Sequence, residues 1–171
     1  MGKADTRRAE IAEKLADFVL AHGLSAASVR PLAEAADLSD RMLMYYFPDK
    51  TAVMAATLEV VAARMTAMLE AVIAPDPMPY DPLKERLAQV VMDDQAWPFF
   101  ALWLEVVAAA GRGDPLYRQV GEQLGRGFLD WVTAQLKSRE KGVESARLFA
   151  AIEGMIVLKA VGLGVVAEAS V

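Results

Sequence analysis

Apolar residues recur along most of this chain at the three- and four-residue spacing of amphipathic helices. Ile11, Leu15 and Val19 follow one another at i, i+4 and i+8, which predicts a helix over residues 5–22. Gly23 follows, and a glycine after the last turn can adopt the left-handed conformation that ends a helix. No run of alternating Val and Ile residues occurs, so we expect no strands.

Capping residues and prolines divide the rest of the chain into further helices. Ser28 and Ser39 each precede a short helix, and Asp49 precedes a long one. The segment 74–82 holds four prolines in nine residues and is the clearest linker. The pattern predicts an all-α protein of about eight helices, over residues 5–22, 29–36, 40–46, 50–73, 82–93, 98–111, 115–141 and 143–167.

The two short helices have the residue spacing of a helix-turn-helix. Counted from Val29, the fifth residue is Ala33, where the crossing of the second helix requires a small side chain. The ninth is Asp37, where the turn requires a positive φ. The apolar positions that bury the crossing are Leu32, Ala36, Leu38 and Leu43. We therefore predict a three-helix, helix-turn-helix DNA-binding domain over 1–52, followed by a separate helical bundle over 53–171.

With its apolar side buried, the second short helix presents its other side to the major groove of double-stranded DNA. Arg41 can donate two hydrogen bonds to guanine, and Met42 and Tyr45 can pack on thymine methyl groups or sugars. Hydroxyl and ammonium groups nearby can reach phosphates. The predicted DNA-binding residues are Ser28, Ser39, Asp40, Arg41, Met42, Tyr45, Tyr46 and Lys50.

Charge argues weakly against this interpretation. The net charge is −5, and residues 1–52 hold seven Lys and Arg against eight Asp and Glu. Asp40 repels phosphate unless it accepts a hydrogen bond from a cytosine amine. An all-α binding or interaction protein with weak or lost DNA affinity therefore remains an alternative function.

A family resemblance extends over residues 11–54, which read IAEKLADFVLAHGLSAASVRPLAEAADLSDRMLMYYFPDKTAVM. This segment resembles the N-terminal domain of TetR-family transcriptional regulators through Gly23, the pair Ser28-Val29, and the aromatic end that closes on Lys50. Asp37 stands where the family has glycine. The segments FFALWLEVVAAAGRGDPLYRQV and LFAAIEGMIVL resemble the family's C-terminal domain more loosely.

The resemblance implies a ligand-responsive homodimer that binds a pseudo-palindromic operator, most often as a repressor. It also implies a C-terminal domain that binds a small molecule and shifts the two DNA-reading heads apart. We expect a hydrophobic or aromatic ligand, because aromatic and methionine side chains on facing helices can line an apolar pocket. The predicted pocket residues are Met65, Met68, Leu87, Val91, Phe100, Trp103, Leu104, Phe128 and Trp131.

The last predicted helix is apolar on almost every side, so it needs two neighbours to cover it. Its glycines would allow close approach of a second helix. Together with the helix before it, this pattern predicts a dimeric four-helix bundle. The predicted interface residues are Leu136, Phe149, Ile152, Met155, Ile156 and Leu163.

No motif for catalysis or metal binding occurs in the sequence. There is no cysteine, and the single His22 lies at a predicted helix end, where a cation is favourable. We therefore expect no catalytic residue, metal or cofactor, although an enzyme on an all-α scaffold is a further alternative. The N-terminus does not read as a signal peptide, and the run GMIVLKAVGLGVVA is too short to span a bilayer. A soluble, cytoplasmic protein is expected, with no membrane partner.

Overall fold

The computed structural model describes residues 2–73 and 76–169, and within these ranges the protein contains helices and no strand. The helices are α1 (Lys3–His22), α2 (Val29–Ala35), α3 (Asp40–Tyr46), α4 (Lys50–Val72), α5 (Tyr80–Met92), α6 (Trp97–Gly111), α7 (Pro115–Gln135), α8 (Lys141–Ala160) and α9 (Gly164–Glu168). The predicted all-α class is therefore confirmed.

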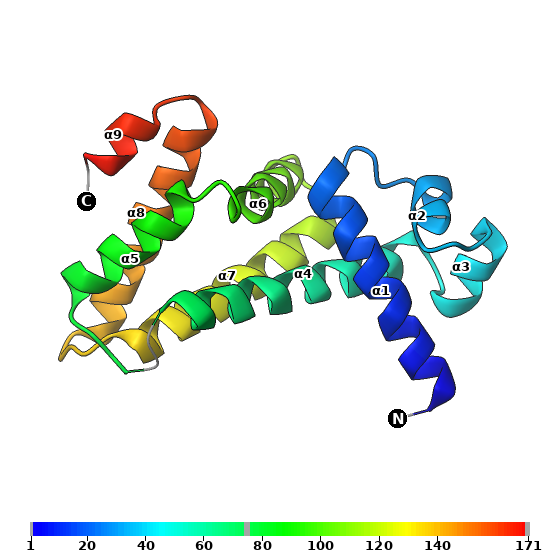
Figure 1. Ribbon diagram of the computed structural model, residues 1–171, viewed down its shortest axis with the longest axis horizontal. Coiled ribbons are helices and arrows are strands. Elements are labelled where there is room, and N and C mark those ends of the chain that lie inside the picture. The colour runs from blue at the N-terminus through cyan, green and yellow to red at the C-terminus, as the bar shows by residue number, and fades with distance from the viewer. Residues whose placement is uncertain (1, 74–75, 170–171) are drawn as a thin grey trace.

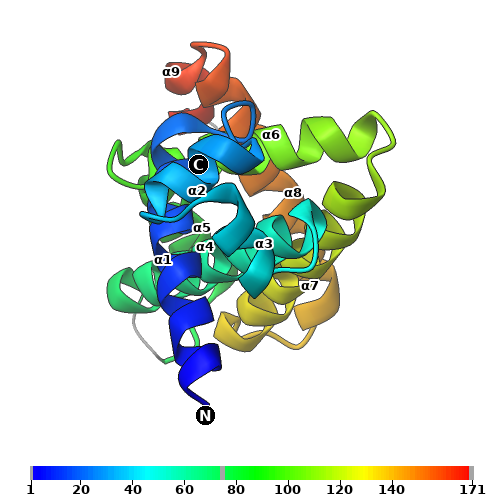
Figure 2. The same cartoon turned by 90° about the vertical axis from the view of Figure 1, so that its right-hand side faces the viewer.

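The molecule is elongated, with a head of three helices at one end (Figure 1). Helices α1, α2 and α3 form the head, and α3 lies at its outer surface (Figure 2). Helices α4 and α7 run lengthwise from the head to the opposite end, where α5, α8 and α9 gather. Helix α6 packs on α7 and also contacts α1, so it connects the head to the remainder of the chain.

The ends of the first helices follow the sequence signals. Gly23 ends α1 with φ +76°, and its N–H donates to the Val19 carbonyl at 2.9 Å. The Ser39 hydroxyl accepts from Met42 N at 3.3 Å, and the Asp49 carboxylate accepts from Ala52 N at 2.8 Å. These side chains satisfy N–H groups that have no partner inside the first turn of a helix.

The middle helices correct two predicted boundaries. Helix α5 begins at Tyr80 rather than Pro82, with Pro79 as its N-cap. Helix α7 ends at Gln135 rather than near residue 141, because the backbone of Met78 pairs with the chain there. Met78 N donates to the Gln135 carbonyl, and Lys137 N donates to the Met78 carbonyl, both at 2.8 Å.

The last predicted helix is in fact two helices. Helix α8 begins at Lys141 and ends at Ala160, two residues before Gly162 adopts φ +82°. The short α9 then packs back on α8. Glycine adopts this positive φ without the steric cost that a Cβ would add, so a sharp turn replaces the continuous helix.

Two apolar cores hold the elongated shape. The first fills the head and includes Leu15, Leu43 and Phe47, together with Leu102 of α6. The second lies between α4, α5, α7 and α8. Trp103 of α6 packs against both cores, so this helix contributes to each.

Helix α4 is long and apolar enough, by length and composition alone, to cross a membrane. Among the described residues it is the one such helix, and the sequence prediction had considered only the shorter C-terminal run. It packs against α1 and α7 and carries Arg64, which is bound to two carboxylates of α1. These contacts favour a core helix of a soluble protein over a membrane span.

Candidate nucleic-acid interface and ligand cavity

The crossing of α2 and α3 has the packing that the sequence pattern predicts. Leu32, Ala33, Ala36 and Leu43 are each at most 1% exposed, so α3 lies directly over the small residue of α2. Asp37 adopts φ +57° in the turn, the one positive-φ residue other than glycine in the described chain. Because these side chains are buried, the packing of the core determines which side of α3 faces outward.

The opposite side of α3 faces solvent. Arg41 is exposed, Met42 is 40% exposed and Tyr45 is 77% exposed. Tyr46 is half-buried and packs edge-on against Tyr45 with ring centroids 5.3 Å apart. Phe47, the residue that follows α3, is fully buried in the core of the head. Arg41 and Tyr45 therefore share a side that is free to enter a groove.

The remaining predicted contacts surround this side. Ser28, Ser39, Asp40 and Lys50 are all exposed, and the Ser28 hydroxyl makes no capping hydrogen bond. Neither Arg41 nor Lys50 belongs to an ion pair within the described residues. Exposed and unpaired, both cations can reach a phosphate or a base edge.

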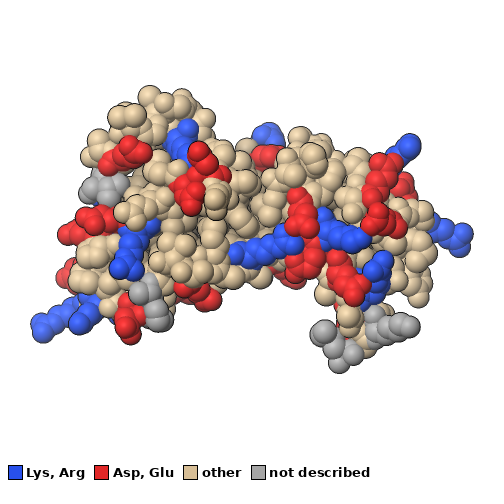
Figure 3. All heavy atoms as spheres, in the orientation of Figure 1, with Lys and Arg blue, Asp and Glu red and all other residues tan. Residues whose placement is uncertain are grey.

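The head nevertheless has no excess of basic residues, since residues 1–52 hold seven Lys and Arg against eight Asp and Glu. On the face drawn in Figure 3, Lys and Arg side chains of the head lie among Asp and Glu side chains rather than in one patch. The turn residue Asp37 binds the ammonium of Lys14 at 2.5 Å, and this hydrogen bond lowers the pKa of Asp37. The Lys14 charge thus faces Asp37, which leaves fewer cations for DNA.

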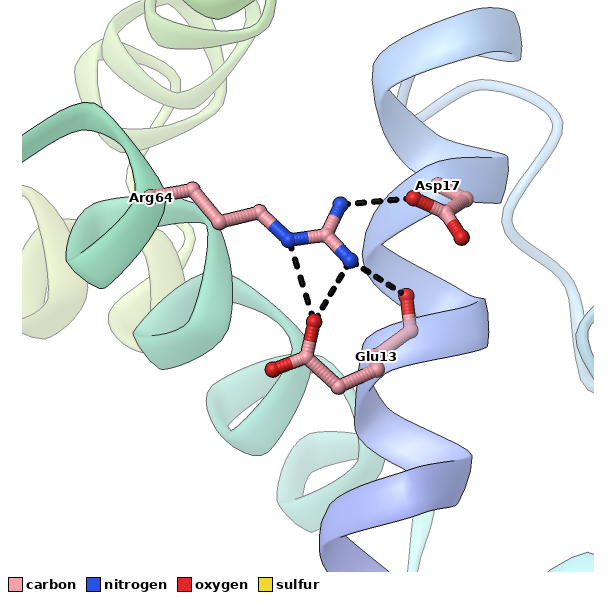
Figure 4. Close-up of polar contacts among 3 residues, drawn as sticks. All are labelled: Glu13, Asp17 and Arg64. Carbon is pink, nitrogen blue, oxygen red and sulfur yellow. Dashed lines mark hydrogen bonds and ion pairs between the residues drawn. The ribbon is translucent and has the colours of Figure 1, made fainter. Parts of the chain in front are cut away.

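An ionic clamp joins the head to α4 (Figure 4). Arg64 Nη1 donates to Asp17 Oδ1 at 2.6 Å, while its Nε and Nη2 donate to Glu13 Oε2 at 3.0 and 2.5 Å. The sequence analysis did not assign this clamp. Arg64 is the only Lys or Arg between residues 51 and 83, and such an isolated cation in an apolar helix was the available signal.

A second polar contact joins the head to α6. The Glu105 carboxylate accepts from Leu24 N at 2.8 Å, beside the end of α1. Glu105 lies inside the apolar segment WLEVV, where the sequence allows a pairing with Arg126 or with a cationic ligand. The pairing with Arg126 is not formed, because Arg126 binds Glu122 one turn away on α7. Glu105 instead satisfies a backbone N–H in the turn between α1 and α2.

A cavity of about 360 Å³ lies between α4, α6, α7 and α8. Five of the predicted pocket residues line it, namely Met65, Phe100, Trp103, Phe128 and Trp131. The other four pack in the second core outside the cavity wall, namely Met68, Leu87, Val91 and Leu104. An apolar pattern identifies side chains that are covered, but it does not say which of them border an empty space.

One carboxylate stands on this otherwise uncharged wall. Glu153 of α8 accepts from Trp103 Nε1, at 2.9 Å through Oε2 and 3.1 Å through Oε1. Burial raises the pKa of Glu153, and the hydrogen bond from Trp103 opposes part of that rise. The sequence analysis missed this residue, although it is the only charged residue between 148 and 158.

The predicted dimer interface is corrected by burial within the single chain. Leu136, Ile152, Met155 and Ile156 are at most 3% exposed, so a second chain cannot reach them. Phe149 lines the cavity, and its ring packs edge-on against Phe128 at 5.4 Å. Leu163 is 48% exposed and remains accessible. The spacing of apolar residues correctly identified the apolar side of α8. However, α5 and α7 of the same chain pack against that side, rather than a second chain.

Comparison with known families finds a similarity in the head. Residues 18–57 match the model of bacterial regulatory proteins of the tetR family. This matched segment contains the helix-turn-helix and the first turns of α4. None of the curated proteins matches the chain in sequence.

Solved structures share the fold over nearly the whole chain. A TetR-family transcriptional regulator from Cytophaga hutchinsonii superposes with a TM-score of 0.75 at 18% identity, covering 98% of this chain and 90% of the other. A transcriptional regulator from Rhodococcus sp. Rha1 gives 0.71 at 20% identity, with the same coverage. The multidrug binding protein EbrR, solved with proflavin, gives 0.67 at 23% identity, covering 88% of this chain and 86% of that protein. The resemblance noted in the sequence is therefore confirmed by an independent family match and by the fold.

Proposed function

Because the chain carries the N-terminal domain of TetR-family regulatory proteins and shares their fold, we propose that it is a ligand-responsive, dimeric transcriptional repressor. It binds a pseudo-palindromic operator in the cytoplasm and is released by a small hydrophobic or aromatic effector. Residues 1–52 read DNA, and residues 53–171 dimerise and sense the effector.

The outward side of α3 carries this proposal. Arg41 donates to a guanine, while Met42 and Tyr45 pack on thymine methyl groups or sugars. Ser28, Tyr46 and Lys50 contact phosphates and thereby set the register of the head on the duplex. The support is the exposure of Arg41 and Tyr45 beside a crossing whose residues Leu32, Ala33, Ala36 and Leu43 are buried and whose Leu38 is half-buried, so neither Arg41 nor Tyr45 belongs to the core.

The cavity supports the effector part of the proposal. Its wall includes side chains of α4 and α6, and each of these helices also holds the head, through Arg64 and Glu105. A ligand that separates these helices moves α1. The two heads of a dimer must lie about 34–36 Å apart to read successive major grooves. A ligand that prefers another spacing releases DNA by shifting the population of conformations.

Dimerisation is proposed through the exposed side of α8 rather than its buried side. Val143, Val157 and Val161 are 51%, 49% and 65% exposed, and Gly154 lies between them on the same side. A Cβ on Gly154 would meet nothing within 4 Å in the single chain. Glycine inside a helix costs about 1 kcal/mol relative to alanine, and at Gly154 no contact in the described part of the chain explains that cost. Close approach of a partner helix explains why a glycine occupies this position.

DNA binding is tested with a fragment of the gene's own promoter region, by fluorescence anisotropy across a series of salt concentrations. We expect binding that weakens steeply with salt. Arg41→Ala relaxes base preference at one position, whereas Lys50→Ala weakens all sequences alike and lowers the salt slope by about one. Lys137→Ala removes an exposed charge far from the head and serves as the control.

Two results would overturn this function. If Arg41→Ala keeps its operator selectivity, the assigned reading residue is wrong. If the wild-type protein binds no DNA at low salt, the acidic head favours the alternative, an all-α interaction protein with weak or lost DNA affinity.

The dimer is tested by light scattering on Gly154→Leu. The single chain has room for this side chain, so we expect a folded monomer near 18.5 kDa where the wild type has twice that mass. Gly111→Leu, which also meets nothing within 4 Å and lies at the end of α6, is expected to stay dimeric. A dimeric Gly154→Leu protein would put the interface elsewhere.

A further inference from the structure

Glu153 is the only charged side chain on the cavity wall within the described chain. The other residues with polar groups in their side chains there are Thr66, Gln123, Trp103 and Trp131. The remainder of the wall is apolar or aromatic. A small ligand inside this cavity therefore meets one site of negative charge and no positive one.

Among the described residues, the carboxylate pairs with no cation. Its described partner is the Trp103 indole, a neutral donor, and the nearest lysine on its helix, Lys159, is committed elsewhere. The ammonium of Lys159 donates to the carbonyls of Val91 and Met92 at 3.1 and 2.9 Å. A buried carboxylate without a counter-charge is unfavourable, and burial raises the pKa of Glu153 accordingly. A cation brought in by a ligand would remove that penalty.

Aromatic rings surround the rest of the cavity. Phe128 stacks on Trp131 with ring centroids 6.1 Å apart and an interplanar angle of 18°. Phe149 packs edge-on against Phe128, and Phe100 and Trp103 line the wall from α6. Aromatic faces attract cations through their quadrupole and also stack on flat apolar ligands. The first property favours a cation of either kind, and the second favours a cation with an aromatic body over an alkylammonium ion.

We infer that the effector is a monovalent cation with an aromatic body, whose charge lies against the Glu153 carboxylate and whose rings lie among Phe128, Trp131 and Phe149. The cavity volume of about 360 Å³ falls at the lower end of the range for drug-sized ligands, which suits a ligand of two or three fused rings. This inference rests on the proposed function, in which the cavity is the effector site, and it adds the charge of the effector.

The test compares two probes of equal shape, 1-methylquinolinium and 1-methylnaphthalene, which differ by one positive charge. Isothermal titration measures their binding to the full-length wild type, to Glu153→Gln and to Glu122→Gln. The Glu153→Gln variant keeps an oxygen acceptor for Trp103 and removes only the charge. Glu122→Gln removes a surface charge on α7, away from the cavity wall, and is the matched control.

We expect the wild type to bind the cation about tenfold to a hundredfold more tightly than the neutral probe, because its attraction to the Glu153 carboxylate and the aromatic rings exceeds the cost of removing the cation from water. Glu153→Gln loses this preference while its affinity for the neutral probe is unchanged, and Glu122→Gln behaves as the wild type. Equal binding of the two probes by the wild type, or a preference that survives Glu153→Gln, would overturn the charge assignment and leave the effector site intact.

Two other outcomes distinguish a failure of this inference from a failure of the proposed function on which it rests. If neither probe binds, the cavity is not an effector site and both proposals fail. If the cation binds through Glu153 but does not weaken DNA binding at saturation, the ligand class stands and the proposed release of DNA fails.

Discussion

Replacing Arg64 with methionine tests whether the ionic clamp holds the head on α4. The substitution keeps an unbranched apolar stem of similar length and removes the guanidinium, whose N–H groups donate to Glu13 and Asp17. The Arg64 side chain is 31% exposed and its partners are 56% and 71% exposed, so solvent screens both pairs. Exposed pairs contribute about 0.2–1 kcal/mol each. The loss also leaves two like charges one turn apart on α1, which costs roughly 0.2–0.5 kcal/mol.

The expected destabilisation of Arg64→Met is therefore about 1–2 kcal/mol at low salt, measured by urea unfolding at fixed protein concentration. The matched control is Arg126→Met, which removes a single pair within α7 and costs about 0.5 kcal/mol or less. In 1 M salt the difference between the two variants shrinks, because exposed charges are then screened. Equal free energies of unfolding for the two variants at low salt would refute the clamp.

Three further substitutions test other contacts. Lys159→Met leaves two carbonyls at the end of α5 without their ammonium donor, and we expect a loss of about 1–3 kcal/mol in urea unfolding, against no measurable loss for the exposed Lys137→Met. Gly23→Ala introduces a Cβ at φ +76° and 2.3 Å from Glu105 Oε1, and we expect thermal unfolding to show a cost of roughly 1–3 kcal/mol. Burial raises the folded-state pKa of Glu153 above its unfolded value, so its contribution to stability is present below the unfolded pKa and is lost as pH rises through the folded pKa. Glu153→Gln removes this dependence and should gain stability over the wild type at pH 8 relative to pH 4; an identical pH profile for the two proteins would contradict this.

Much of the structure of the head could be predicted from the sequence, because the residues that determine it lie close together along the chain. The residues before α3 and α4, Ser39 and Asp49, cap those helices through bonds that reach only three residues along the chain. The positive φ of Gly23 and Asp37 likewise follows from residue type and position. Ala33 and Leu43 are buried as the helix-turn-helix spacing requires, since 3.6-residue periodicity determines which side of a short helix faces the crossing.

The sequence by itself thus determined the all-α class, the helix-turn-helix and the outward side of α3, since each depends on propensity and spacing within about twenty residues. Tertiary structure alone decided which groups from distant segments meet. Met78 ends α7 by backbone pairing, Glu105 reaches the turn after α1, and Glu153 accepts a hydrogen bond from Trp103 on the cavity wall. These partners are fifty or more residues apart. The spacing of apolar residues on α8 shows that one side of the helix is buried. Whether α5 and α7 or a second chain buries that side depends on how the whole chain packs.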